Sequence, residues 1–151
     1  MWSTPFQSGL DAALTARQLV YCNTLQMMLD VPPKATPDTD SGYFEELTKA
    51  IFRSWFSWRV VRQKWGSFHD SFDGFDLDGE AGFGAEDIDQ LFDDKGIIRN
   101  RRKILATLEN ASTMLDLIAV HGAFHGYMRS LDSLDYYGRV AALTTRFSWL
   151  G

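Results

Sequence analysis

The sequence of 151 residues has little of the chemistry that metal and redox sites require. It contains one cysteine, Cys22, and three histidines. A single cysteine cannot form an internal disulfide, and the supply of soft metal ligands is thin. Cys22, His69, His121 and His125 are enough in number for a zinc site, but Gly122 interrupts the helical spacing of His121 and His125. The sequence therefore predicts no metal and no cofactor.

Long apolar runs and signal-like features are also missing. No segment approaches the roughly 20 apolar residues of a membrane helix, and residues 1–5 lack the basic and then apolar pattern of a secretory signal. We expect a cytoplasmic protein without membrane contact. Only four residues are proline, whereas 45% are hydrophobic and 14% aromatic. This composition predicts one folded domain over residues 1–151.

The charge balance disfavours a general attraction to nucleic acid, because the net charge is −5. One local segment is the exception, since nine consecutive residues hold five cations and no acidic residue. These cations are Lys95, Arg99, Arg101, Arg102 and Lys103. They either meet phosphate groups or form a solvated helix face, and we favour phosphate because cations at a helix start oppose its dipole.

Apolar residues recur at helical spacing along most of the chain, and no segment alternates as a strand would, so we expect an all-α fold. The longest stripe lies on one face of the helix expected at 100–119 and should be core. Its members are Ile104, Leu108, Ala111, Leu115 and Ile118. Other helices are expected at 10–29, 43–56, 85–92, 124–131 and 133–146. The second of these continues over 58–65, and Gly96 is the expected C-cap of the third. A proline-rich connection is expected at 32–42.

Several motifs resemble the 3-methyladenine DNA glycosylase I family. The most specific is the run from Gly96 to Ile104, followed by Asn110-Ala111, and upstream matches fall at the family's spacing. The upstream matches are Phe44-Glu45, Ser57-Trp58, and Phe68, Phe72, Phe75 and Asp76. The resemblance implies a fold of the helix-hairpin-helix glycosylase type, in which a damaged base is turned out of bent DNA.

The resemblance covers the chain unevenly. Residues 1–42 are divergent, 43–115 are family-like, and 116–151 end at the start of the family's DNA-binding hairpin, with backbone N–H groups near Gly151. The second hairpin helix and the cysteine–histidine pairs that hold zinc in the family have no counterpart. We therefore expect an exposed apolar end, at Phe147, Trp149 and Leu150, that favours self-association or a protein partner.

The resemblance also implies a base pocket. Trp58 matches the family's tryptophan that stacks on the base, although it is equally a core residue. Trp55 and Phe44 are further candidates for base contact, and the Trp55 indole could instead fill the space of a flipped base. Ala50 stands where the family has its carboxylate. Glu46, one helical turn earlier, is a weak substitute, with Glu45 as its neighbour, and a solvated helix charge is the alternative.

Two functions follow from these observations. The first is a DNA N-glycosylase that excises alkylated bases such as 3-methyladenine from damaged duplex DNA. The second is a catalytically inactive homologue that acts as a DNA-binding or protein-interaction scaffold, which Ala50 and the bulk of Trp55 favour. An enzyme is the preferred interpretation, because the central match is long and specific.

Overall fold

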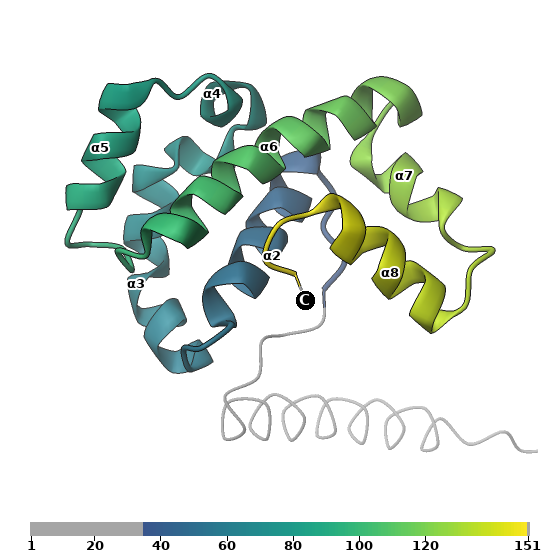
Figure 1. Ribbon diagram of the computed structural model, residues 1–151, viewed down its shortest axis with the longest axis horizontal. Helices are drawn as coiled ribbons and strands as arrows, with labels where there is room; N and C mark the ends of the chain where they lie inside the picture. Colours follow the sequence, from purple (N-terminus) through teal and green to yellow (C-terminus); the bar gives the residue numbers. More distant parts are fainter. Residues whose placement is uncertain (1–34, 151) are drawn as a thin grey trace, which may run out of the picture. The chain divides into compact units, whose positions relative to one another are not determined.

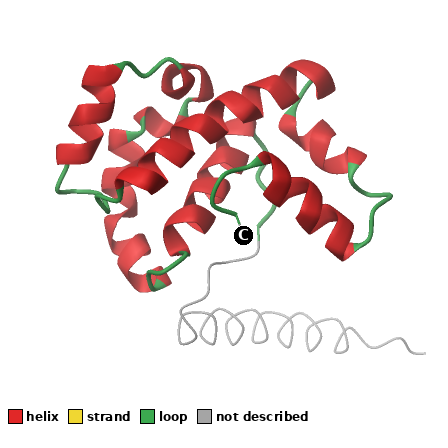
Figure 2. Ribbon diagram, viewed as in Figure 1, coloured by secondary structure: helices red, strands yellow, loops and turns green. Residues whose placement is uncertain are grey.

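The computed structural model describes residues 35–150, so the helix expected at 10–29 and the residue Gly151 lie outside the described residues. Within the described range the chain is helical throughout, with no strand (Figure 2). The all-α expectation is confirmed. No described helix is both long enough and apolar enough to cross a membrane.

Helix α6 lies across the middle of the unit formed by residues 36–151 (Figure 1), and several of the other helices pack against it. It spans Arg101–His121. The remaining helices are α2 (Asp40–Arg53), α3 (Trp58–Ser71), the short 3-10 helix η1 (Asp73–Phe75), α4 (Leu77–Ala81), α5 (Ala85–Asp93), α7 (Phe124–Ser130) and α8 (Tyr136–Arg146).

Local signals in the sequence place the ends of α6. The Asn100 side chain accepts a hydrogen bond from the backbone N–H of Lys103 at 3.2 Å, which caps the first turn. Gly122 ends the helix in the left-handed region with φ of 81°, where a residue without Cβ carries no steric penalty. The expected boundaries at 100–119 are therefore right to within two residues.

The core is dominated by aromatic rings from the region between α3 and η1. Trp65, Phe68, Phe72 and Phe75 lie in nearly parallel planes, with ring centroids 5.1–5.9 Å apart. Phe68, Phe72 and Phe75 are fully buried. Offset stacking of this kind adds to the hydrophobic gain from burial, so the run of phenylalanines is a packing device.

Three sequence-based expectations need correction. The helix expected at 43–56 begins at Asp40 and ends at Arg53, and 58–65 belongs to the separate helix α3. Gly96 is not a C-cap, because α5 ends at Asp93 and Asp94 caps it. The glycine-rich stretch after Ser71 contains the short helices η1 and α4.

The apolar stripe of α6 is confirmed at one end and shifted at the other. Ile104, Leu108 and Ala111 are buried, as expected, but Met114 and Leu117 are the buried residues of the following turns. Leu115 and Ile118 are only partly buried against the core. The stripe drifts because 3.6 residues per turn do not match a fixed alternation of three and four over five turns.

Candidate functional site

A tight turn, residues 54–57, joins α2 to α3 and forms one side of the candidate site. Trp55 occupies the left-handed region with φ of 77°, and its indole is 90% exposed. Such a backbone conformation is costly for a bulky residue and persists only where neighbouring contacts enforce it. Ser57 then starts α3 by accepting the N–H of Val60.

Lys103 supplies the contacts that enforce this turn. Its side chain is fully buried, and Nζ donates to the backbone carbonyls of Ile51 at 2.8 Å, of Phe52 at 3.4 Å and of Ser54. The carbonyls of Ile51 and Phe52 lie in the last turn of α2 and that of Ser54 at its C-cap, where carbonyl oxygens lack N–H donors within the helix. The cation thus satisfies them, although burial lowers the pKa of the Lys103 ammonium.

A second polar residue of α6 holds the C-terminal segment, residues 147–150. Asn110 is fully buried and makes two hydrogen bonds with Ser148. Its Nδ2 donates to the backbone carbonyl of Ser148 at 3.0 Å, and its Oδ1 accepts the backbone N–H of Ser148 at 2.8 Å. Ser148 Oγ also donates to Glu109 at 2.8 Å. Trp149 follows with φ of 66°, a second bulky residue in the left-handed region.

The turn and the C-terminal segment enclose a hollow of about 190 Å³, lined by Ala50, Ser54, Trp55, Trp149 and Leu150. This volume is below the roughly 300 Å³ of pockets that take drug-sized ligands, so it suits a small ring system. Lys103 and Asn110 lie two turns apart on one face of α6, and each holds one side of the hollow. We call this feature the two-tryptophan hollow.

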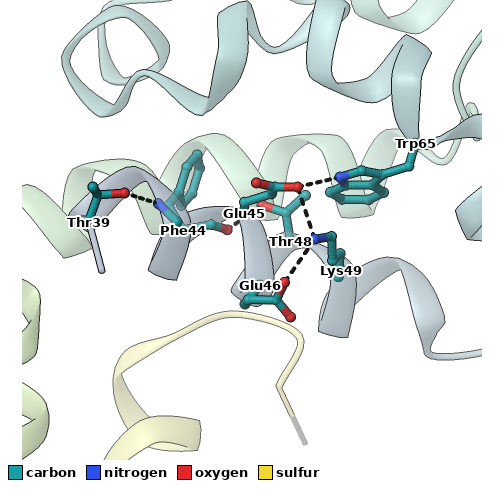
Figure 3. Close-up of polar contacts among 8 residues, drawn as sticks. Thr39, Phe44, Glu45, Glu46, Thr48, Lys49 and Trp65 are labelled. Carbon is teal, nitrogen blue, oxygen red and sulfur yellow. Dashed lines mark hydrogen bonds and ion pairs between the residues drawn. The ribbon is translucent and has the colours of Figure 1, made fainter. Parts of the chain in front are cut away.

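The carboxylates nearest in sequence to Ala50 are already paired (Figure 3). Glu45 accepts the indole N–H of Trp65 at 2.6 Å and lies 2.9 Å from Lys49, while Glu46 lies 2.8 Å from Lys49. Burial would raise the pKa of Glu45, but the hydrogen bonds from Lys49 and Trp65 outweigh it and lower this pKa. Glu45 is therefore held as an anion, and Glu46 remains 47% exposed.

The aromatic residues predicted to bind a base lie in three different environments. Trp55 lines the two-tryptophan hollow. Trp58 is half-buried against the core, with the guanidinium of Arg53 5.9 Å from its ring, and is not among the lining residues. Phe44 is fully buried and packs edge-on against Phe75 at 6.0 Å, so its ring serves the core in this structure.

The predicted basic cluster divides into an exposed part and a buried part. Lys95, Arg99, Arg101 and Arg102 are exposed, and the Arg101 guanidinium lies 4.4 Å from the ring of Phe92. Lys103 turns inward to the carbonyls described above. Four cations therefore remain available at the start of α6.

Sequence reasoning missed the polar residues that build the hollow. The sequence alone predicts Asn110 only as part of a motif and Lys103 only as a phosphate-binding or solvated charge. A signal for both was present, because Lys103, Thr107 and Asn110 recur at spacings of four and three within the apolar face of a helix. Polar groups buried at such positions need internal partners.

A metal site finds no support in the described residues. Among residues 35–150, no group of three or more histidine, cysteine, aspartate or glutamate side chains is placed to hold an ion. His125 instead forms a 3.0 Å hydrogen bond between Nδ1 and the hydroxyl of Tyr43.

The fold itself defines a class of protein. The chain resembles the all-helical fold of 3-methyladenine DNA glycosylase I structures, of which one gives a TM-score of 0.68 at 24% identity over 78% of this chain and 75% of the other. The sequence profile of the methyladenine glycosylase family matches residues 35–142. The chain belongs to the methyladenine glycosylase family.

Individual relatives match part of the chain. DNA-3-methyladenine glycosylase 1 of Escherichia coli K12 is 35% identical over 82 residues, which are 54% of this chain and 44% of the relative. The chain thus spans less than half the length of that relative. The Staphylococcus aureus 3-methyladenine DNA glycosylase I gives a TM-score of 0.60 at 23% identity, covering 64% of this chain and 51% of the other.

Proposed function

We propose that the chain acts in DNA base excision, by hydrolysing the N-glycosidic bond of a damaged base that is turned out into the two-tryptophan hollow. The relatives' names supply the lesion class, alkylated bases such as 3-methyladenine. The observation that carries the proposal is a small hollow with two tryptophan walls, in a family whose members act on bases. Base–aromatic stacking contributes roughly 1–3 kcal/mol per base.

The remaining roles follow from exposure and charge. Lys95, Arg99, Arg101 and Arg102 meet DNA phosphates, each contact making binding weaker at higher salt. Glu46 lies one turn before Ala50 and is the exposed carboxylate of that face, so it supports the positive charge that develops on the sugar as the bond breaks. The site of action is the cytoplasm.

The experiment is release of free 3-methyladenine and 7-methylguanine from methylated duplex DNA by the wild-type chain. Variants Trp55→Ala and Glu46→Gln should lower release at least about tenfold, whereas the surface variant Asp78→Asn on α4 should match wild type. Wild-type protein that is folded yet releases no base would contradict the proposal.

A second function is favoured by one observation, the absence of a carboxylate at Ala50. In this version the chain binds damaged or bent DNA, or another protein, without cutting the bond. The variant Ala50→Glu separates the two, because release that appears only in this variant means that the fold has lost its chemistry. Equal release by wild type and Ala50→Glu would exclude the scaffold.

A further inference from the structure

Among the described helices, α8 alone has no buried residue. Its inward side is a stripe of residues at helical spacing, which consists of Arg139, Ala142, Leu143 and Arg146. Ala142 and Leu143 pack partly against the core. Arg139 donates to the backbone carbonyl of Leu134 at 3.0 Å, and the Arg146 guanidinium lies 5.9 Å from the Tyr127 ring of α7. Both charges of the helix are therefore directed toward the protein.

The opposite side of α8 carries no charge. Its residues recur at the same helical spacing and are Tyr137, Val140, Ala141 and Thr144, which we call the outer stripe. All four are exposed, Tyr137 at 79%. The solvent side of a surface helix normally holds charged or strongly polar residues. An aromatic, a β-branched and two small residues in their place indicate a contact surface.

The outer stripe replaces the contact surface that the sequence predicts at the C-terminal end. That prediction placed the exposed apolar residues at Phe147, Trp149 and Leu150. Phe147, however, is 3% exposed and belongs to the core. The unpartnered apolar surface thus lies one helix earlier, on α8.

The chemistry of the outer stripe narrows its occupant. The stripe has no cation to meet a phosphate, so duplex DNA gains little there. A partner with a charged contact face would lose hydration without gaining a counter-ion. A second copy of this chain presents an equally uncharged stripe. Contact between two such stripes brings no like charges together, although each copy has a net charge of −5.

The two ends of α8 differ in charge and indicate the direction of pairing. Asp135 lies at the N-terminal end, where its side chain accepts the backbone N–H of Gly138 at 2.7 Å. Arg146 is the last residue of the helix, and residues 136–151 contain no acidic residue. Antiparallel pairing brings the acidic end of each helix near the basic end of the other and opposes the two helix dipoles. Parallel pairing would place like ends together.

We infer that the chain forms a two-fold homodimer through antiparallel contact between the outer stripes of two α8 helices. This association goes beyond the proposed function and does not depend on it. A two-fold axis at Val140 and Ala141 places Tyr137 of one copy against Thr144 of the other. The small side chain of Ala141 lets the helices approach closely. Because the contact uses one face of an 11-residue helix, the dimer is weak and depends on concentration.

Sedimentation velocity of the full chain tests the association. Between about 2 and 400 µM the wild type should shift from monomer to dimer, with a dissociation constant on the order of 10–100 µM. Tyr137→Glu places a carboxylate in the contact and should weaken the dimer at least about tenfold. Val120→Glu on α6 is the matched control, because Val120 is 77% exposed and gains the same charge. Its dissociation constant should match that of the wild type.

Two results would overturn the homodimer. One is a wild-type chain that stays monomeric over the whole range, and the other is equal weakening by Tyr137→Glu and Val120→Glu. A monomeric chain whose binding to duplex DNA is lost in Tyr137→Glu and kept in Val120→Glu would instead assign the outer stripe to DNA.

Disulfide trapping tests the direction of pairing. In a Cys22→Ser background, which removes the chain's one cysteine, the variants Tyr137→Cys and Thr144→Cys are oxidised separately and as an equimolar mixture. Antiparallel contact predicts that the mixed dimer forms in excess over the random proportion, because it brings positions 137 and 144 of different copies within reach of a disulfide. An excess of like dimers, or a random proportion, would contradict the antiparallel arrangement.

Discussion

Two buried ionisable residues, Lys103 on α6 and Glu80 on α4, differ in whether they have hydrogen-bond partners. Lys103 is fully buried with three carbonyl partners. Glu80 is 1% exposed, and neither of its carboxyl oxygens has a hydrogen-bond partner among the described residues. Burial, followed by repulsion from Asp76 and Asp73, raises the pKa of Glu80 to about 9.

The difference shows what a buried charge needs. A charged group remains ionised inside a protein when neighbouring dipoles replace its hydration, and otherwise it takes up or loses a proton. Lys103 therefore builds structure, because it fixes the turn that lines the two-tryptophan hollow. Glu80 is neutral at pH 7 and makes stability depend on pH.

The largest effect is expected from Glu80, whose protonation changes the free energy of unfolding. In the folded state its pKa, about 9, lies above the usual glutamate pKa of 4.5. Between these values the unfolded state has lost a proton that the folded state keeps, so the free energy of unfolding falls as pH rises, by about 1.4 kcal/mol per unit at most. Below pH 4.5 the contribution is fully present. Urea unfolding across this window should display the fall.

The variant Glu80→Gln removes the titration and should flatten this pH dependence, with stability above wild type by several kcal/mol at about pH 8. Asp78→Asn on the same helix is exposed and serves as the control, which should follow the wild-type curve. A Glu80→Gln curve that runs parallel to wild type would show that Glu80 is not the titrating group.

The next largest effect is expected when the buried ammonium group of Lys103 is removed. Replacement by methionine keeps much of the volume but removes the ammonium donor from the carbonyls of Ile51, Phe52 and Ser54. Of these carbonyls, that of Ile51 also accepts from the Ser54 hydroxyl at 2.7 Å. We expect a loss of about 3 kcal/mol in urea unfolding. Lys64→Met is matched, because Lys64 donates to two carbonyls at the protein surface, and it should cost under about 1 kcal/mol.

Asn110 is a buried polar residue without charge, so its replacement measures the contribution of hydrogen bonds alone. Asn110→Ala removes both hydrogen bonds to Ser148 and should lower the free energy of unfolding by about 2 kcal/mol. The indole N–H resonance of Trp149 should broaden or move, since its segment loses its attachment to α6. Thr113→Ala, on the exposed side of the same helix, should leave both unchanged.

The smallest effect tests the turn that Lys103 holds. Trp55→Gly relieves a left-handed backbone at a side chain that buries almost nothing, so stability should rise slightly, by about 0.5 kcal/mol. Thermal unfolding measures this shift. Phe56→Gly, whose backbone is not left-handed, should be destabilising, and an equal rise in both variants would contradict the strain argument.

Much of the fold could be predicted from local sequence. Asn100 and Gly122 mark the ends of α6 by capping chemistry, and the interruption that the sequence predicts at Gly122 is confirmed. The break between α2 and α3 could not be predicted, because apolar spacing runs on through Trp55. The periodicity of apolar residues shows only which face of a helix is apolar. It does not reveal a turn that is stabilised by a residue of a distant helix.

Less of the candidate site than of the fold could be predicted from the sequence. The sequence by itself determined the family motifs, the loss of a carboxylate at Ala50 and an all-helical chain with a basic helix start, because these depend on residue identity and local spacing. The tertiary structure is needed to show that Lys103 points inward, that Trp149 and Trp55 line one hollow and that the Glu80 carboxyl has no hydrogen-bond partner among the described residues. The fate of a long side chain depends on which backbone groups, some 50 residues away, lie within hydrogen-bond reach.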